Sequence, residues 1–275
     1  NYYRKIYFKM RIFFLGDIVG RSGRIAVIKN LKDILEKKKI DFVIVNGENA
    51  ADQGVGITEA ISNDLFNSGV DVITTGNHVW DQKETVNHIE RETRLLRPEN
   101  ISNNSPGKGF GIYKSKNGFN VGVLNLMGNV FMKKCDDVFK TAEMFKNKYK
   151  LKEDYDFLVV DFHGEITSEK MAMGHFFDGR ATLVVGTHTH VPTNDVRILT
   201  NGTAYQTDAG MCGDYDSVIG MNKGNSLNRF LKKDSTKHYP AEGEATLSGL
   251  IVECNTSSGL AYKAEPYIYG GELIK

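Results

Sequence analysis

The chain has few cysteines, few prolines and almost no excess of charge. Its 275 residues include three cysteines and five prolines, and 35 Lys and Arg residues face 34 Asp and Glu residues, for a formal net charge of +1. The charge balance argues against nucleic acid or a membrane surface as the main partner. The cysteines form no C-x-x-C pair, so we expect them to be reduced and buried, outside any disulfide framework; they are Cys135, Cys212 and Cys254.

Long apolar runs are also missing. No run approaches the roughly 20 residues that span a bilayer, and the first ten residues lack the apolar core of a secretory signal, so we expect a cytoplasmic protein. The first strand-like run begins near Met10. We therefore predict that residues 1–9 are an N-terminal extension and that residues 10–275 form a single domain. A homo-oligomer is compatible with a chain of this size, but the composition does not decide it.

Short apolar runs alternate with helical segments, which indicates an α/β fold. The predicted strands cover residues 11–17, 41–49, 70–78, 121–126, 156–165, 181–190, 202–210 and 247–254. Residues 22–39 predict a helix that Ser22 caps. Its buried face would contain Ile25, Ile28, Leu31 and Leu35. Residues 57–69 predict a second helix, which ends at Gly69.

The segment from about 208 to 245 is rich in glycine and polar residues. It is too long for a plain connection between two elements of a domain. We therefore interpret it either as a functional loop or lid, or as a surface loop without a role. Tyr215 in this segment could stack on a nucleobase, although we favour its interpretation as a core or surface tyrosine.

Residue types that bind metals follow five of the predicted strands. They are Asp17, Glu48 with Asn49, Asn77 with His78, His163, and His188 with His190. The carboxyl ends of strands gather at one edge of an α/β sheet, so these side chains should meet at one site. His188 and His190 are two residues apart and would share a face of an extended backbone. Gly16, Gly47 and Gly76 precede three of the groups and fit a backbone that turns sharply.

Each of these residues alone has a simpler interpretation. Asp17 could cap a helix, Asn49 and Asn77 could lie in turns, and His163 could be a hydrogen-bonded core histidine. Together the ligand candidates comprise two carboxylates, two carboxamides and three imidazoles, which exceed the needs of one ion. A bridging carboxylate would divide them between two ions, and a set without thiolates favours Fe, Mn, Zn or Co. Two such ions leave the centre positive, which suits an anionic phosphoryl group.

The order of these motifs resembles the calcineurin-like metallophosphoesterases and, more closely, the YmdB-like branch of that superfamily, over residues 10–275. The matching stretches are "FLGDIVGRSGR" (14–24), "VNGENAADQGVGIT" (45–58), "TTGNHVWD" (74–81), "DFHGEITSEK" (161–170), "VVGTHTHVPT" (184–193) and "TDAGMCGDYDSVIG" (207–220). Three features depart from the broad superfamily and are typical of this branch. Asp17 is not followed by the usual D-x-H histidine, Glu48 replaces a bridging aspartate, and the last motif reads Gly-Thr-His-Thr-His.

The resemblance implies a fold, a set of ligands and a reaction. The fold would be an αββα sandwich, in which helices flank two mixed β-sheets. One ion would be held by Asp17, Glu48, Asn49 and His190, and the other by Glu48, Asn77, His163 and His188. The resemblance favours iron, with manganese or zinc as alternatives. A metal-bridging hydroxide would attack a phosphodiester, such as a 2′,3′- or 3′,5′-cyclic nucleotide, and His78 would act as the general acid.

Two other functions remain open from the sequence. The site could belong to a phosphomonoesterase, or to a non-enzymatic regulatory protein that binds metal without turnover. A dinucleotide-binding turn is a poor alternative, because Gly16, Gly20 and Gly23 do not have the G-x-G-x-x-G spacing.

Overall fold

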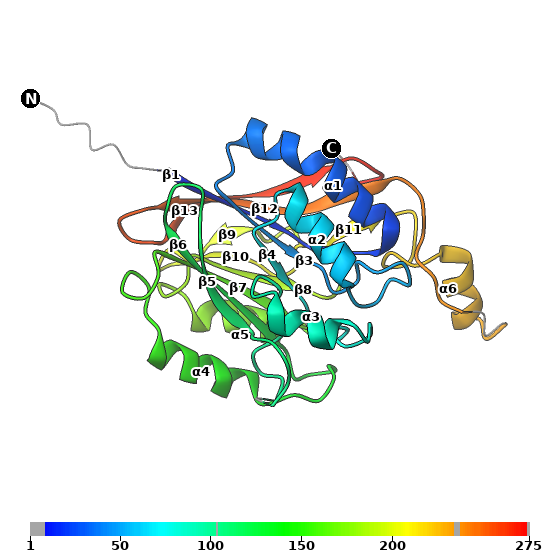
Figure 1. The fold of residues 1–275 in the computed structure, drawn as a ribbon, viewed down its shortest axis with the longest axis horizontal. Helices are drawn as coiled ribbons and strands as arrows, with labels where there is room; N and C mark the ends of the chain where they lie inside the picture. Colours follow the sequence, from blue (N-terminus) through cyan, green and yellow to red (C-terminus); the bar gives the residue numbers. More distant parts are fainter. Residues whose placement is uncertain (1–8, 103, 234–236, 274–275) are drawn as a thin grey trace, which may run out of the picture.

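Two mixed β-sheets pack face to face, and helices cover their outer faces (Figure 1). The structure is a computed structural model that describes residues 9–102, 104–233 and 237–273. The predicted extension over residues 1–9 lies outside this range except for Lys9, which is the first residue of strand β1. No helix among the described residues is long and apolar enough to cross a membrane.

The first sheet has the strand order β2-β11-β12-β1-β3-β4, with β13 paired to β12. Its strands are Lys9–Leu15 (β1), Asp17–Ile18 (β2), Phe42–Asn46 (β3), Val72–Thr74 (β4), Met211–Asp214 (β11), Ala245–Asn255 (β12) and Ala261–Tyr269 (β13). The second sheet has the order β5-β6-β7-β8-β10-β9. Its strands are Phe110–Lys114 (β5), Asn120–Met127 (β6), Phe157–His163 (β7), Leu183–Thr187 (β8), Arg197–Ile198 (β9) and Ala204–Gln206 (β10). Each of the eight predicted runs contains a strand.

Helices line both outer faces of the sandwich. They are Gly20–Lys38 (α1), Glu59–Ser68 (α2), Thr85–Arg91 (α3), Val138–Lys148 (α4), Thr167–Phe176 (α5) and Lys223–Phe230 (α6). In Figure 1, α1 and α2 lie over the sheet that contains β1, whereas α4 and α5 lie on the side of β5, β6 and β7. The α/β architecture that the alternating runs predicted is therefore present as two sheets between two helical layers.

The central strands are apolar on both faces because each face is covered. In β1, Met10, Ile12 and Phe14 pack between the two sheets. The intervening Phe13 and Leu15 pack under α1 and α2. Since side chains alternate along a strand, a buried strand between two layers reads as an unbroken apolar run. This explains why the strands were visible in the sequence without polar and apolar alternation.

The predicted start of the first helix was wrong. Helix α1 begins at Gly20 with Val19 as its N-cap, and the Ser22 hydroxyl donates instead to the carbonyl oxygen of Ala241. Its buried residues are Gly20, Gly23, Val27, Leu31, Ile34 and Leu35. The side chain of Ile25 is therefore exposed, and Ile28 is only partly buried. The second prediction was right, because α2 ends at Gly69, which has a left-handed φ of 112°.

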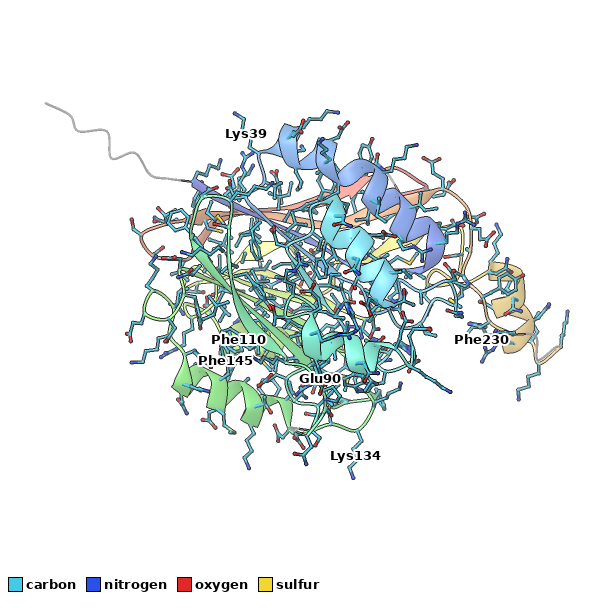
Figure 2. All side chains as sticks on the ribbon, viewed as in Figure 1. Lys39, Glu90, Phe110, Lys134, Phe145 and Phe230 are labelled. Carbon is cyan, nitrogen blue, oxygen red and sulfur yellow. The ribbon has the colours of Figure 1, made fainter. Side chains whose placement is uncertain are left out.

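The described parts of the 208–245 segment, residues 208–233 and 237–245, include regular elements. The segment contains β11 and α6, and its first part packs against the end of β8. Phe230 on α6 points away from the body of the molecule, whereas Phe110 and Phe145 face each other between β5 and α4 (Figure 2).

Cys212 and Cys254 are buried and Cys135 is half-buried, and none of the three forms a disulfide.

Candidate metal centre

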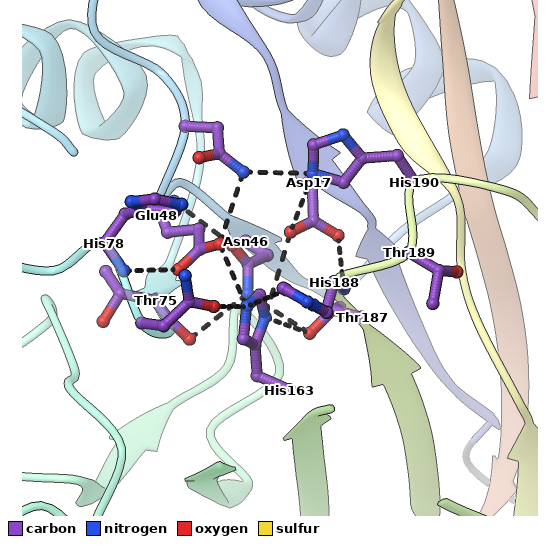
Figure 3. Close-up of polar contacts among 12 residues, drawn as sticks. Asp17, Asn46, Glu48, Thr75, His78, His163, Thr187, His188, Thr189 and His190 are labelled. Atoms are coloured by element: carbon purple, nitrogen blue, oxygen red, sulfur yellow. Dashed lines mark hydrogen bonds and ion pairs between the residues drawn. The ribbon is translucent and has the colours of Figure 1, made fainter. Parts of the chain in front are cut away.

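The topology brings the predicted ligands to one edge of the sandwich. Strands β1, β3 and β4 run parallel in one sheet, and β6, β7 and β8 run parallel in the other. The segments after these strands carry the polar residues, so donors that are far apart in the sequence face one another (Figure 3). Glu48, Asn77, His163 and His188 form one tight group, and Asp17, Asn49 and His190 lie beside it.

His163 is the centre of the first group. Its Nε2 atom lies 2.9 Å from Glu48 Oε1, 3.0 Å from Asn77 Oδ1 and 3.1 Å from His188 Nδ1. A single N–H cannot donate to three acceptors. Two atoms that each coordinate one ion at about 2.1 Å are about 3–3.5 Å apart, so these separations suit ligands of a shared metal. The ligand atoms of Glu48, His163 and His188 all lie within 4.8 Å of one another.

The second group surrounds Asp17. Its Oδ1 atom is buried and has no hydrogen-bond partner among the described residues. It lies 3.8 Å from His190 Nε2, which in turn lies 3.1 Å from the side-chain amide nitrogen of Asn49. A buried carboxylate oxygen without a donor is costly, whereas a cation would satisfy it. The residues present therefore fit a second metal position next to the first.

The electrostatics of the first group favour positive charge. Burial by itself would raise the pKa of Glu48, but the adjacent His163 reverses this effect and lowers that pKa to about 2. Burial would lower the pKa of His163, but the facing carboxylate of Glu48 raises it to about 9. Glu48 is thus ionised and requires a positive neighbour. Burial, followed by repulsion from His163, lowers the pKa of His188 to about 3, which leaves its imidazole neutral as a ligand must be.

The two histidines after β8 reach the cluster, but not by sharing a face of an extended backbone as predicted. The strand ends at Thr187, and His188 and His190 have φ values of 101° and 66° instead of extended backbone. The loop between them turns so that each ring reaches a different part of the cluster. His188 meets His163 and His190 extends toward Asp17 (Figure 3).

The glycines before the ligands serve close approach, not a special turn. A Cβ atom on Gly76 would lie 2.2 Å from His163 Cδ2, and one on Gly16 would lie 2.0 Å from the carbonyl oxygen of Gly210. Neither residue has a positive φ. The absent side chain at Gly76 therefore leaves the space that His163 and Glu48 occupy.

His78 stands at the rim of the centre. Its backbone N–H donates to Glu48 Oε2 over 3.1 Å, while its ring Nδ1 lies 2.7 Å from Asp81 Oδ2. The contact with Asp81 fixes the ring and leaves Nε2 as the nitrogen that can meet a substrate. Lys133 approaches from another loop and donates to the carbonyl oxygen of Asn77 over 2.6 Å.

Comparison with known proteins identifies the family. Residues 13–267 match the family described as YmdB-like protein. The chain belongs to the YmdB-like family. A relative from Bacillus subtilis (strain 168) is named 2′,3′-cyclic-nucleotide 2′-phosphodiesterase. It is 44% identical over 256 residues, which cover 93% of this chain and 96% of that relative.

Two solved structures have the same fold as this YmdB-like chain. A hypothetical protein from Thermus thermophilus has a TM-score of 0.86 and 38% identity, and the match covers 96% of this chain and 100% of the other. A novel phosphatase from Mycoplasma pneumoniae has a TM-score of 0.87 and 34% identity, with 95% and 94% covered. The expected metallophosphoesterase-type sandwich of two mixed sheets is confirmed.

The YmdB-like structure also contains neighbours of the candidate ligands that the sequence did not reveal. Asp161 is fully buried inside β7, and its Oδ1 accepts from the hydroxyl of Thr187 over 2.7 Å. Its other oxygen, Oδ2, accepts from the Thr74 hydroxyl and from the side-chain amide of Asn46, so both oxygens of Asp161 accept hydrogen bonds although burial raises its pKa to about 6. Thr187 has one proton and gives it to Asp161, so His163 Nδ1 donates to Thr187 over 2.9 Å. His163 Nε2 is thereby free to bind a metal.

Glu165 is another missed neighbour. Its Oε2 atom lies 3.0 Å from His188 Nε2, the nitrogen opposite the one that faces His163. A carboxylate at this position orients a ligating imidazole. Neither Asp161 nor Glu165 could be recognised from its neighbours in the sequence, because each acts through a residue on another strand.

Proposed function

We propose that the chain is a metal-dependent phosphodiesterase with a dinuclear centre. The observation that carries the proposal is the position of Glu48. Its Oε1 atom lies 2.9 Å from His163 Nε2 and 3.3 Å from the amide nitrogen of Asn49, so one buried carboxylate contacts both proposed ligand sets. One ion would be held by Asp17, Glu48, Asn49 and His190, and the other by Glu48, Asn77, His163 and His188. Iron is the first candidate, with manganese or zinc as alternatives.

Bound ions supply two things here: they make a nucleophile available at neutral pH and they neutralise charge on the phosphoryl group. The chain itself supplies the proton for the leaving oxygen. Asp81 accepts the Nδ1 proton of His78 and holds the ring, so Nε2 can donate to that oxygen. The ammonium group of Lys133 lies 3.5 Å from Asp81 Oδ1 and adds a positive charge at the rim for the anionic substrate.

The substrate we propose is a cyclic nucleotide. The Bacillus subtilis relative is named for 2′,3′-cyclic nucleotides, and its similarity extends over 93% of this chain. A 2′,3′-cyclic substrate has an alkoxide leaving group, which needs an acid such as His78. The leaving group of a 3′,5′-cyclic nucleotide is an alkoxide too, so the name of this relative alone places 2′,3′-cyclic nucleotides ahead of 3′,5′-cyclic nucleotides.

The test combines elemental analysis with turnover. Protein purified without chelator should contain up to two transition-metal ions per chain. With Fe, Mn or Zn supplied, it should hydrolyse 2′,3′-cyclic AMP faster than 3′,5′-cyclic AMP, and bis-p-nitrophenyl phosphate faster than p-nitrophenyl phosphate. Preference for the monoester would favour a phosphomonoesterase, and bound metal without hydrolysis of any substrate would favour a regulatory protein.

Single substitutions test whether hydrolysis depends on the metal cluster. Glu48→Ala should lose both metal ions and all hydrolysis, because the bridging carboxylate is gone. Glu244→Ala is the matched control, since Glu244 is exposed and lies outside the cluster. A Glu48→Ala protein that keeps two ions would remove the bridge from the proposal.

A further inference from the structure

The loop that carries His188 and His190 holds an unfavourable backbone. Both residues have positive φ values, 101° and 66°, where residues with a side chain are uncommon. Such conformations persist only where the surrounding structure over-determines them. Thr189 lies between the two histidines, and in Figure 3 its side chain extends away from the cluster that the rings join. A contact that fixes Thr189 therefore also fixes the backbone that carries both imidazoles.

Asp208 is the group that holds Thr189. Its Oδ2 atom accepts from the backbone N–H of Thr189 over 3.1 Å and from the Thr189 hydroxyl over 2.7 Å. Its Oδ1 atom accepts from the backbone N–H of Gly210 over 2.8 Å, which fixes the carboxylate against the segment after β10. The carboxylate of Asp208 thus holds the loop at its midpoint, Thr189.

Lys170 completes the arrangement. Its Nζ atom lies 2.6 Å from Asp208 Oδ2, and both side chains are only 1% exposed. Lysine and aspartate are almost never fully buried unless they are paired. Lys170 is on α5, Asp208 follows β10 and Thr189 follows β8, so the three side chains join segments that are far apart in the sequence.

We propose that Lys170, Asp208 and Thr189 form a positioning unit that presents His188 and His190 to the metal ions. The inference rests on the proposed function, in which these two histidines serve different ions. Other contacts are made to the two histidines and not to the midpoint of the loop. The backbone N–H of His188 donates to Asp17 Oδ2, the Tyr215 hydroxyl donates to the carbonyl oxygen of His190, and His190 Nδ1 donates to the carbonyl oxygen of Ile219. The unit gives a role to two residues of the quoted motifs that are not ligands themselves, the lysine that ends "DFHGEITSEK" and the aspartate in "TDAGMCG".

The simpler alternative is a buried ion pair that serves stability alone. In that case any substitution that weakens the packing of α5 to the same extent should have the same effect on the metal site. Met173 provides this comparison, because it lies one turn after Lys170 on α5 and is fully buried in the core beneath that helix.

The experiment compares Thr189→Val, Thr189→Ser, Lys170→Met and Met173→Ala. Thr189→Val keeps the side-chain shape but loses the hydroxyl that donates to Asp208, whereas Thr189→Ser keeps this hydroxyl. Hydrogen exchange of a peptide that covers residues 184–193 is measured after chelator treatment, and Mn²⁺ affinity is measured by titration. We expect Thr189→Val and Lys170→Met to exchange faster and to bind Mn²⁺ about 10–100-fold more weakly, the size typical of lost support behind a ligand.

Thr189→Ser should restore both measurements, and Met173→Ala should lower the melting temperature without changing either of them. Wild-type exchange and wild-type Mn²⁺ affinity in Thr189→Val and Lys170→Met would overturn the positioning role, and so would an equal effect of Met173→Ala. Exchange in the chelated protein reports on the loop even if the wild type proves to have no phosphodiesterase activity. That result would count against the proposed function and not against the positioning unit.

Discussion

At the scale of single residues, His78 can be separated from the ligands around it. It lies at the rim, its ring is held by Asp81, and only its backbone contacts Glu48. His78→Ala should therefore keep its metal and lose about 10²–10⁴ in kcat on a cyclic nucleotide. The loss should be much smaller on bis-p-nitrophenyl phosphate, because p-nitrophenolate leaves without a proton. Steady-state rates on both substrates, with metal analysis of the same samples, check this.

An equal loss on both substrates would contradict an acid role for His78. Asp81→Asn is the companion variant, since it keeps the imidazole but replaces the carboxylate that accepts the Nδ1 proton. We expect it to show the same dependence on the leaving group with a smaller loss of kcat.

Lys133 gives a second prediction at this scale. Its side chain is 57% exposed and its ammonium group contacts the rim of the site. Lys133→Met should raise KM for a cyclic nucleotide about 2–5-fold and leave kcat nearly unchanged, because exposed ion pairs contribute about 0.2–1 kcal/mol. The adjacent Lys134 is also exposed and serves as the control. If Lys134→Met shifts KM as much as Lys133→Met does, the effect belongs to the general charge of the loop.

The sequence revealed the candidate ligands but not the residues that support them. Asp17, Glu48 and His163 could be found because each follows an apolar run, and strand ends meet at one edge. Asp161 and Lys170 could not be found in this way. Asp161 lies inside β7, and Lys170 lies on a helix among ordinary helix formers. Their partners are Thr187 at the end of β8 and Asp208 after β10, so only the tertiary structure shows that these polar groups are satisfied.

At the scale of elements, strands were easier to predict than helix faces. A strand between two covered layers is apolar throughout, so its position is visible without knowing which residue faces which layer. Which face of a helix is buried depends on the elements that pack against it, and a Cβ atom on Gly23 of α1 would lie 2.0 Å from the carbonyl oxygen of Cys212 in β11. Helix α1 begins at Gly20 instead of Ser22, and its glycines at 20 and 23 lie on the packed side. Ile25 is consequently directed to solvent, although its spacing from Leu31 and Leu35 suggested a shared face.

Helix α1 offers a direct check of this correction. Leu31 is fully buried in the core beneath the helix, whereas Ile25 is 48% exposed. Leu31→Ala should lower the free energy of unfolding by about 2–5 kcal/mol, the cost of a buried cavity. Ile25→Ala should change it by about 0.5 kcal/mol or less, as surface substitutions do. Chemical denaturation of both variants measures the difference, and equal losses would restore the face that the sequence predicted.

At the scale of the whole molecule, the candidate centre joins the two sheets. Asp17, Glu48 and Asn77 follow strands of the sheet that contains β1, whereas His163 and His188 belong to β7 and to the segment after β8 in the other sheet. An apolar cluster fills the space between the sheets, and next to this edge Asn46 and Thr74 of one sheet donate to Asp161 of the other. At the edge itself, carboxylates and imidazoles replace apolar contacts, so a cation bound there would link donors from both sheets.

Metal binding should therefore stabilise the fold as a whole. At a free Mn²⁺ concentration of about 100 times Kd, a single site adds about 2.7 kcal/mol. For a chain of this size, that corresponds to an increase in Tm of about 5–10 °C over the chelated protein. Thermal denaturation with and without Mn²⁺ measures the shift, and Glu48→Ala should abolish it while Glu244→Ala keeps it. A Tm that does not respond to metal in the wild type would show that the donors from the two sheets do not share an ion.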